Sequence, residues 1–220
     1  MKRAPGALIK GRLITVEGLD GCGKTTQLSL LAQRLAQVSP PVTTMLTLNP
    51  GGTPLGKNLR QLLLNEKQTG LTPAPMAELL LYLADRAQHV TQVIRPALEQ
   101  QQTVLCDRFT DSTVAYQGYG RGFEVAMIHQ MNQWSTGGLV PDCTLLFDGP
   151  VAALRARLTG EPDRLESENL AFFERTRQGF LDLARQYPRR IHVIDALQSP
   201  EAIAEQVWRL VSPLFAERPL

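Results

Sequence analysis

The chain has 220 residues, of which 43% are hydrophobic and 20% are charged, and its formal net charge is +2. A chain of this length and composition can bury a hydrophobic core without disulfides or structural metals, which excludes disorder as its default state. The near-neutral charge argues against a nucleic-acid partner, and the longest apolar stretches fall far short of the about 20 residues that a membrane helix needs. No secretory signal is visible, and the three cysteines are odd in number and widely spaced. These features predict a protein of the reducing cytoplasm with neither a disulfide framework nor a zinc site.

Arginine outnumbers lysine by 18 to 5. The planar guanidinium suits bidentate recognition of phosphate oxygens, so the surplus is consistent with phosphate ligands. Genomic base composition explains it equally well. The surplus therefore becomes informative only where the arginines fall within motifs.

Short β-type runs alternate with helical patterns along the chain. Residues 1–11 have no periodicity and are expected to form a loose arm. Five strands are predicted, at Leu13–Glu17, 42–48, Thr103–Asp107, Cys143–Asp148 and Ile191–Asp195.

Helical patterns separate the predicted strands. Leu28, Leu31 and Leu35 recur at helical spacing after the first strand and give one apolar face. The later helices are expected at about 53–64, at 73–98 with a bend near Pro96, at 124–134, from Pro150 onward, and at 199–215. This alternation predicts one α/β domain over residues 12–220, with a doubly wound, five-stranded parallel sheet flanked by helices.

Residues 18–25 read G-L-D-G-C-G-K-T and satisfy the phosphate-binding pattern G-x-x-x-x-G-K-[ST] in full. The glycines let consecutive backbone N–H groups surround phosphates, and the helix that follows adds partial positive charge. Lys24 can reach the β- and γ-phosphates, and the Thr25 hydroxyl can bind Mg²⁺. The pattern predicts a P-loop that binds ATP with Mg²⁺. Its expected ATP-binding residues are Gly18, Leu19, Asp20, Gly21, Cys22, Gly23, Lys24, Thr25 and Thr26.

Two further groups of residues are suited to nucleotide chemistry. Asp107 ends an apolar strand, where a Walker-B-type carboxylate would meet Mg²⁺ directly or through water. Arg108 follows at the edge where parallel sheets bind ligands, so it can hold a second phosphate; a surface salt bridge is the alternative. Tyr82 and Arg86 lie four residues apart on one helical face, so a ring and a guanidinium can converge on one ligand. On its own, a tyrosine within the apolar run 79–83 is more often part of the core.

The residues after the third predicted strand resemble the D-R-[YHF]…S-[TN/S]-x-A-Y-Q signature of thymidylate kinases. They read D-R-F at 107–109 and D-S-T-V-A-Y-Q at 111–117. Further segments match that family in order, at 16–21, 50–56, 78–88, 94–98, 141–142, 155–157, 160–164 and 172–177. The resemblance covers about residues 12–213. It implies a P-loop kinase that phosphorylates dTMP to dTDP with ATP and Mg²⁺, in dTTP biosynthesis, and that forms a homodimer through packed helices.

The resemblance also implies roles for single residues. Arg108 is similar to the arginine that binds the acceptor phosphate. Tyr82 is similar to the aromatic residue that stacks on thymine, and Arg86 to the arginine that hydrogen-bonds thymine O4.

The rest of the implied acceptor site lies in two segments. Thr113 matches a position that contacts the pyrimidine edge, and Tyr116 matches the tyrosine that crowds a 2′-hydroxyl and so favours deoxyribose. Asp20 is similar to the acid that approaches the 3′-hydroxyl. For Gln117, contact with the ligand and support of the loop are equally open.

Arg155, Arg157 and Arg164 flank a segment of Gly, Glu, Pro and Asp residues. Charge alone favours a solvated loop. Beside a P-loop the alternative is a mobile lid over about 155–168, whose arginine would be worth about 10³–10⁵ in rate. Thymidylate kinases supply this arginine from the P-loop or from the lid, and Gly21 stands where the first type has arginine, so the chain resembles the lid-arginine type. The expected catalytic residues are Lys24, Arg108, Arg155, Arg157 and Arg164, and the expected metal ligands are Thr25 and Asp107.

Leu48 and Asn49 depart from the family pattern, which has Arg-Glu before Pro-Gly-Gly. A phosphate-binding arginine and a carboxylate near the metal are therefore missing, and one lost charge-assisted contact costs about 1.5–3 kcal/mol. Whether Arg60, Arg121 or a lid residue substitutes stays open. The departure also keeps open a kinase for another pyrimidine monophosphate, or a P-loop regulator that binds nucleotides with weak or no turnover.

Overall fold

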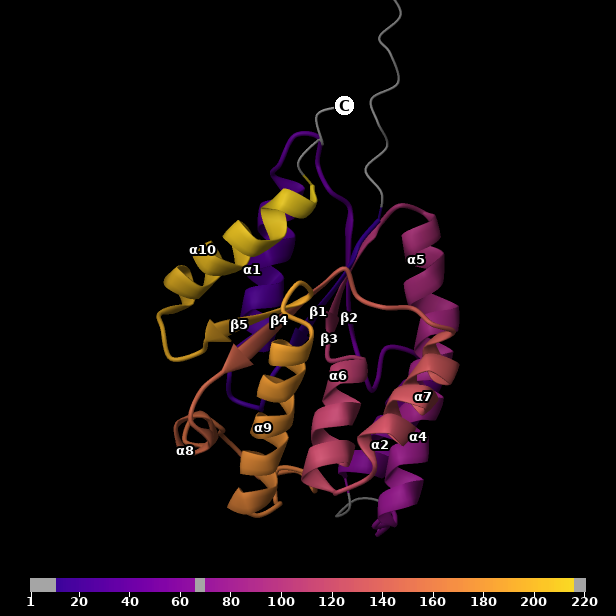
Figure 1. The fold of residues 1–220 in the computed structure, drawn as a ribbon. Helices are drawn as coiled ribbons and strands as arrows, with labels where there is room; N and C mark the ends of the chain where they lie inside the picture. Colours follow the sequence, from indigo (N-terminus) through magenta and orange to yellow (C-terminus); the bar gives the residue numbers. More distant parts are fainter. Residues whose placement is uncertain (1–10, 66–69, 216–220) are drawn as a thin grey trace, which may run out of the picture.

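The centre of the molecule is a sheet of five parallel strands in the order β2-β3-β1-β4-β5 (Figure 1). The computed structural model describes residues 11–65 and 70–215. The strands are β1 (Leu13–Glu17), β2 (Thr44–Leu48), β3 (Thr103–Asp107), β4 (Cys143–Asp148) and β5 (Ile191–Asp195). The predicted fold class is therefore confirmed. β1 is the middle strand and is buried along its whole length. The loop that follows it lies at the carboxyl edge of the sheet, at the point where the strand order reverses.

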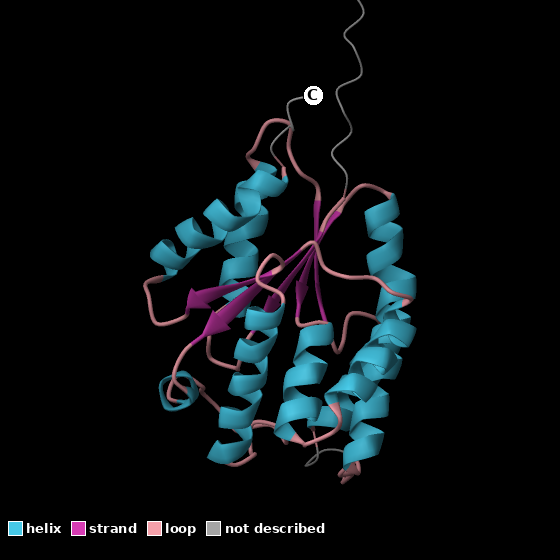
Figure 2. Ribbon diagram, viewed as in Figure 1, coloured by secondary structure: helices cyan, strands magenta, loops and turns pink. Residues whose placement is uncertain are grey.

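Helices cover both faces of this sheet (Figure 2). In chain order they are α1 (Lys24–Ala36), α2 (Pro54–Leu64), α4 (Pro75–His89), η1 (Val90–Ile94), α5 (Arg95–Glu99), α6 (Thr110–Thr113), η2 (Val114–Gly120), α7 (Val125–Thr136), α8 (Val151–Arg155), α9 (Leu170–Gln186), α10 (Pro200–Val211) and η3 (Ser212–Leu214). The pair α1 and α10 lies side by side, and α9 lies beside the continuous segment α6–η2 (Figure 1). The helices therefore form layers on the sheet, as doubly wound folds require.

The helix-start signals in the sequence are confirmed at two helices. The Thr53 hydroxyl accepts a hydrogen bond from the Gly56 amide at the start of α2, and Ser199 does the same for Ala202 at the start of α10. The strand expected over 42–48 pairs only from Thr44. Of the arm expected over 1–11, residues 1–10 lie outside the described residues.

The long helix expected over 73–98 is continuous but changes its hydrogen-bond pattern before Pro96. It consists of α4, the π-helical η1 and α5, and the Arg95 amide donates to the Val90 carbonyl five residues back. Proline has no N–H and clashes with the carbonyl four residues before it in an α-helix. A π turn immediately before Pro96 relieves this mismatch, so the irregularity lies upstream of the proline.

The structure has two helical regions, α6–η2 and α9, where the sequence pattern predicts no helix. The α6–η2 segment carries β-branched residues and two glycines, which lower helix propensity, and most of its residues are buried. Helix α9 buries an apolar face that includes Phe172, Phe173 and Phe180. Tertiary burial stabilises both segments. The helix expected from Pro150 is the short α8.

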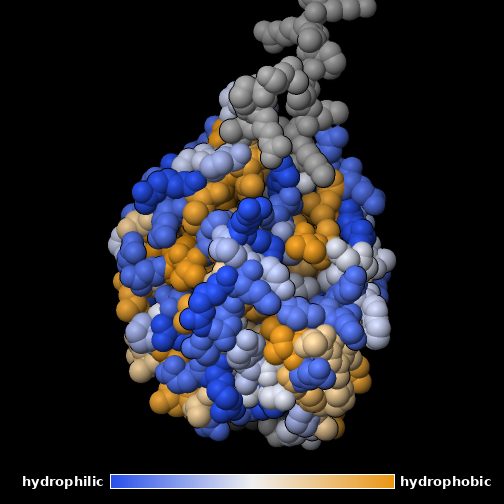
Figure 3. Space-filling model, viewed as in Figure 1, coloured by the Kyte–Doolittle hydropathy of each residue, from blue (hydrophilic) through white to orange (hydrophobic). Residues whose placement is uncertain are grey.

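The surface mixes hydrophilic and hydrophobic residues, and hydrophilic ones cover most of the face seen in Figure 3. Among the residues that the structure describes, no helix is long and apolar enough to cross a membrane.

Candidate active site

The glycine-rich loop after β1 wraps around the side chain of Lys24. Gly18 and Gly21 have φ values of +132° and +81°, and a Cβ at either position would lie 2.3 Å from a carbonyl oxygen of another segment. Only glycine fits there. The Lys24 ammonium donates to the Gly18 carbonyl at 3.2 Å and to the Leu19 carbonyl at 3.0 Å. The loop thus positions a cation at the N-terminus of α1, where anions bind.

Thr25 and Asp107 meet at the carboxyl edge of the sheet. The Thr25 hydroxyl lies 3.5 Å from Asp107 Oδ2, and Asp107 Oδ1 is buried without a hydrogen-bond partner among the described residues. A hydroxyl and an unpaired carboxylate oxygen are ligands that would suit Mg²⁺ beside the phosphates of a bound nucleotide. No group of three or more His, Cys, Asp or Glu side chains that could hold a metal ion occurs in the described part of the chain.

A cavity of about 730 Å³, here called the donor cavity, opens beside the P-loop. It is lined by Asp20, Gly21, Gly23, Lys24, Thr25, Thr26, Leu48, Asn49, Arg60, Asp107, Arg108, Arg157 and Thr159. Six of the nine residues predicted to bind ATP lie on it. The other three lie behind the loop surface: Gly18 and Leu19 hold Lys24 through their carbonyls, and Cys22 is buried with its Sγ 3.7 Å from the lysine nitrogen.

A smaller cavity of about 110 Å³, here called the acceptor pocket, adjoins the donor cavity. All seven residues predicted to bind the acceptor line it: Asp20, Tyr82, Arg86, Arg108, Thr113, Tyr116 and Gln117. The two cavities share Asp20, Asn49, Arg60 and Arg108. These four residues therefore mark the boundary between the two sites.

Arg108 is held rigidly at this boundary. Its guanidinium donates to Asp20 at 2.6 Å and to the Gly18 carbonyl at 2.9 Å, and it lies 5.2 Å from the centre of the Tyr116 ring. Although burial alone would raise the pKa of Asp20, Arg108 and Lys24 hold it well below its usual range. Arg108 also has a φ of +67°, a conformation that costs a residue other than glycine about 1–3 kcal/mol. The surrounding contacts must offset that cost.

Arg86 is buried in the wall of the acceptor pocket, with 1% of its surface exposed. Its Nη1 donates to Asn132 at 2.7 Å, and its Nη2 donates to Asn49 at 2.9 Å and to the Phe109 carbonyl at 3.0 Å. Burial lowers the pKa of Arg86 to about 10, so the side chain remains charged at neutral pH. Its Nε has no hydrogen-bond partner among the described residues. One donor of this fixed guanidinium is therefore buried and unpaired.

Glu17 supports this site from outside both cavities, a role that no sequence motif indicates. The carboxylate accepts hydrogen bonds from the Phe109 amide at 2.8 Å and the Ser112 hydroxyl at 2.5 Å. Burial and the nearby Asp111 raise the pKa of Glu17 to about 7. Glu17 thus fixes the segment that carries Arg108. The available signal is an acidic residue at the end of a predicted strand, directly before the P-loop.

The structure places the two residues that depart from the family pattern in different environments. Leu48 lies on the donor cavity with 39% of its surface exposed. Asn49 is buried, and it links Asp85, which accepts from its amide nitrogen, to Arg86. Arg60 lines both cavities, whereas Arg121 pairs with carboxylates outside them. Of the candidates to replace the missing arginine, Arg60 and the lid residue Arg157 thus line the donor cavity, and Arg121 does not.

The three arginines of the lid region lie in three different places. Arg157 lines the donor cavity and donates to the Ala196 carbonyl at 2.8 Å. Arg155 lies 4.6 Å from the centre of the Phe173 ring, away from both cavities. Arg164 donates to Glu78 on α4 and, at 2.7 Å, to the Leu63 carbonyl on α2. The structure therefore brings only Arg157 of the three to the donor cavity.

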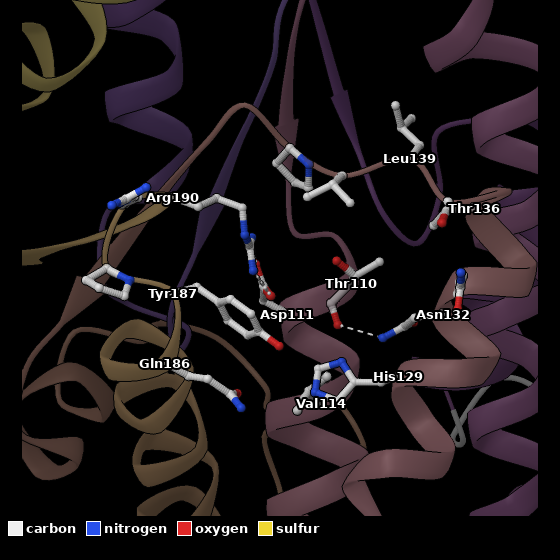
Figure 4. A pocket seen from close by; sticks show the side chains of 16 residues that line it. Thr110, Asp111, Val114, His129, Asn132, Thr136, Leu139, Gln186, Tyr187 and Arg190 are labelled. Carbon is white, nitrogen blue, oxygen red and sulfur yellow. Dashed lines mark hydrogen bonds and ion pairs between the residues drawn. The ribbon is translucent and has the colours of Figure 1, made fainter.

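A third cavity, of about 660 Å³, lies between α6, α7 and the turn before β5 (Figure 4). It shares no residue with the other two cavities and contains none of the predicted site residues. Asn132, which binds Arg86, and the Asp111–Arg190 ion pair form part of its wall. This cavity therefore lies behind the acceptor pocket and does not belong to it.

The thymidylate kinase family model matches residues 16–207. A thymidylate kinase of Gloeobacter violaceus is 52% identical over 208 residues, which cover 93% of this chain and 96% of the relative. A thymidylate kinase of Deinococcus radiodurans is 47% identical over 205 residues, covering 92% and 97%. The crystal structure of thymidylate kinase from Ehrlichia chaffeensis matches with a TM-score of 0.76 and 34% identity, covering 92% of this chain and 98% of its own.

Proposed function

The chain belongs to the thymidylate kinase family, and we propose how its own residues carry out the reaction, the ATP-dependent phosphorylation of dTMP to dTDP. The chain is a nucleoside monophosphate kinase with a P-loop fold. The observation that carries the proposal is the shared boundary of the two cavities, where Arg108 and Arg60 stand between the P-loop and the acceptor pocket. A phosphoryl group transferred between two nucleotides must cross such a boundary.

On the donor side, Lys24 neutralises the β- and γ-phosphates of ATP, and Thr25 and Asp107 hold Mg²⁺. When bound, Mg²⁺ supplies further neutralisation of charge on the transferring group. Arg157 is the lid cation that faces this cavity. Arg155 belongs to the same proposed catalytic set, but it reaches the phosphates only after leaving the Glu168 carbonyl. Arg164, which the resemblance also puts in that set, is bound to Glu78 of α4 and Leu63 of α2, so the role proposed for it is to position the lid.

On the acceptor side, Arg108 and Arg60 hold the phosphate of dTMP in line with the γ-phosphate. The acceptor phosphate is already an anion, so positioning and electrostatic stabilisation carry the rate and no strong base is needed. Tyr82 provides a ring for the thymine, and the unpaired Nε of Arg86 is a donor for its O4.

Four residues complete the proposed acceptor site. Thr113 and Gln117 line the part of the pocket proposed for the base, and Tyr116 crowds the position of a 2′-hydroxyl. Asp20 stands near the sugar and is kept ionised by Arg108. Together these groups favour a deoxyribonucleotide with a pyrimidine base.

We further propose that the protein forms a homodimer. Helices α2 and α4 pack together, and Leu55, Met76 and Leu80 on them are 46%, 41% and 49% exposed. Of the apolar run 79–83, Leu79 and Leu83 belong to the core, which leaves Leu80 for a partner. A Leu80→Glu variant measured by light scattering should have half the mass of the wild type; an unchanged mass would contradict a dimer through this face.

The cytoplasm is the proposed compartment. Cys22, Cys106 and Cys143 are all free and buried, as expected for a protein kept under reducing conditions.

A coupled ADP-release assay over a panel of nucleoside monophosphates tests the proposed function. We expect dTMP to give the highest kcat/KM, with dUMP lower because it lacks the methyl group, and ribonucleotides lower still because of Tyr116. If another pyrimidine monophosphate gave the highest kcat/KM, that monophosphate and not dTMP would be the preferred acceptor. ATP binding without turnover of any monophosphate would contradict the kinase assignment.

A further inference from the structure

The lid segment of this chain covers the acceptor pocket. Asp163, Leu165 and Glu166 line that pocket, and none of them lines the donor cavity. With the lid in this position the acceptor pocket holds about 110 Å³. Pockets that bury small ligands usually hold about 300–1,000 Å³. The pocket must therefore widen as a nucleotide binds, and this segment is the part of its wall that the lid contributes.

One buried carboxylate holds the segment in place. Glu78 lies on α4, one turn before Tyr82, with 1% of its surface exposed. It accepts a hydrogen bond from Arg164 of the lid, one from Gln117 Nε2 at 3.0 Å, and two from Arg121, from Nε at 3.2 Å and from Nη2 at 3.0 Å. The lid, α4 and the acceptor-binding segment η2 therefore meet at a single side chain.

Arg121, which binds Glu78, also binds Glu168 at the C-terminal end of the lid. Arg121 donates to Glu168 through Nη1 while its other nitrogens bind Glu78. The lid is thus attached at Arg164, which lies among the residues that line the pocket, and at Glu168, which lies beyond them. Burial opposes the charge of Glu78, but its hydrogen bonds to Arg121, Gln117 and Arg164 keep its pKa below the usual value. Bonds of this kind between buried charged groups are strong, and breaking one leaves an unpaired charge.

We propose that Glu78 holds the lid closed over the acceptor pocket, so that binding of the monophosphate and closure of the lid are coupled. The lid segment is here called the gate, and Glu78 its catch. In this role Glu78 and Arg164 are positioning residues, and neither touches the reacting atoms in the closed state. Gln117 connects the catch to the acceptor, because it lines the pocket and binds Glu78. The inference rests on the proposed function, since the pocket is taken to hold dTMP.

The test compares Glu78→Gln, Arg164→Met and the double variant with the wild type. Each single change removes the ion pair between lid and α4, so we expect KM for dTMP to rise about tenfold or more, which is the effect of losing one charge-assisted bond. The double variant should be no worse than the more impaired single variant, because the two residues act as one unit. KM for ATP should change little, since neither residue lines the donor cavity.

A second measurement reports on the gate directly. Hydrogen exchange of amides in residues 159–168 should slow when dTMP is added to the wild type, and this protection should be lost in Glu78→Gln and Arg164→Met. Arg12→Met is the matched control, because it removes the Arg12–Asp142 ion pair at the opposite edge of the sheet. It should leave lid exchange and KM unchanged. Thermal melts of every variant establish that it is folded.

Additive effects of the two single changes on KM for dTMP would overturn this proposal. Protection of the lid amides by dTMP that survives in both single variants would overturn it as well. A wild type that forms no dTDP would instead contradict the proposed function. The two failures are therefore distinguishable.

Discussion

The two halves of the cleft are built differently. In the acceptor pocket the two arginines are fixed by several partners within the protein, Arg86 by Asn49 and Asn132 and Arg108 by Asp20. Of the arginine nitrogens named above for this pocket, Arg86 Nε alone has no partner among the described residues. In the donor cavity, about 730 Å³ against about 110 Å³, the oxygen Asp107 Oδ1 has no partner among the described residues. The acceptor side is preorganised by the chain, whereas the donor side is completed by what binds there.

This difference predicts different consequences of substitution. A preorganised site selects its ligand, because buried groups left unpaired by a wrong ligand cost free energy. An open site with few fixed contacts acts mainly on the charge that develops during the reaction. Changes on the donor side should therefore act on kcat, and changes on the acceptor side on KM for the monophosphate.

The largest effect is expected from Lys24→Met. It removes the P-loop cation, and loss of one such electrostatic contact lowers kcat by about 10²–10³-fold. The dissociation constant of dTMP should stay within about threefold of the wild type, since Lys24 does not line the acceptor pocket. Steady-state kinetics and calorimetric titration measure the two quantities.

Lys57→Met serves as the control for this prediction, because Lys57 is exposed on α2 and lines neither cavity. If Lys24→Met raised the dissociation constant of dTMP by as large a factor as it lowered kcat, the donor and acceptor sides would not act separately.

Arg86→Lys tests the acceptor side. Lysine keeps the charge but lacks the planar fork, so it cannot satisfy Asn49, Asn132 and the Phe109 carbonyl together and still donate to a base. We expect KM for dTMP to rise about 10–100-fold and the free energy of unfolding to fall by about 1–3 kcal/mol, with kcat reduced much less. Kinetics and urea denaturation measure these effects. A loss confined to kcat would contradict the assignment of Arg86 to binding.

A smaller effect is expected at the boundary, where Arg60 lines both cavities. Arg60→Met should lower kcat/KM for dTMP by about tenfold, the cost of one charge-assisted phosphate contact. Adding Leu48→Arg to that variant restores a cation on the donor cavity and should recover much of the loss, because the side chains of Leu48 and Arg60 both approach Gly51 and both line that cavity. The single change Leu48→Arg should alter kcat/KM by less than about threefold. No recovery in the double variant would show that position 48 cannot replace Arg60.

The parts of this cleft that the sequence predicts are those encoded by neighbouring residues. Buried strands, proline after an N-cap and the glycine pattern around Lys24 are local signals, and the structure places them as expected. The four boundary residues come from four segments, yet Asp20 and Arg108 were identifiable because each lies in a motif at the end of a strand.

The partners of the lid arginines were not predictable in the same way. Arg164 meets Glu78, a residue 86 positions earlier in the chain, and nothing in either local sequence indicates the pairing. Asn49 likewise looks like a loss when compared with the family pattern, and only the fold shows that it links Asp85 to Arg86. Contacts of this kind depend on how helices pack, which the sequence pattern of a single chain does not specify.

Glu17 holds the segment that carries Arg108, through the Phe109 amide and the Ser112 hydroxyl, and lines neither cavity. Its pKa is raised from 4.5 to about 7 by burial and by Asp111. Between about pH 4.5 and pH 7 the unfolded chain has lost this proton while the native protein keeps it. The contribution of Glu17 to the free energy of unfolding therefore falls as pH rises through this window, by as much as about 3 kcal/mol, and is constant above it.

Glu17→Gln keeps the shape of the side chain and removes this titration. Urea denaturation at pH 5, 6, 7 and 8 should show the variant gaining stability relative to the wild type as pH rises, with little effect on kcat because the amide oxygen can still accept from the Phe109 amide. Parallel stability curves would show that Glu17 is ionised throughout this range. The support beneath Arg108 would then carry a full negative charge, and the acceptor side would depend on charge pairing below the cleft as well as within it.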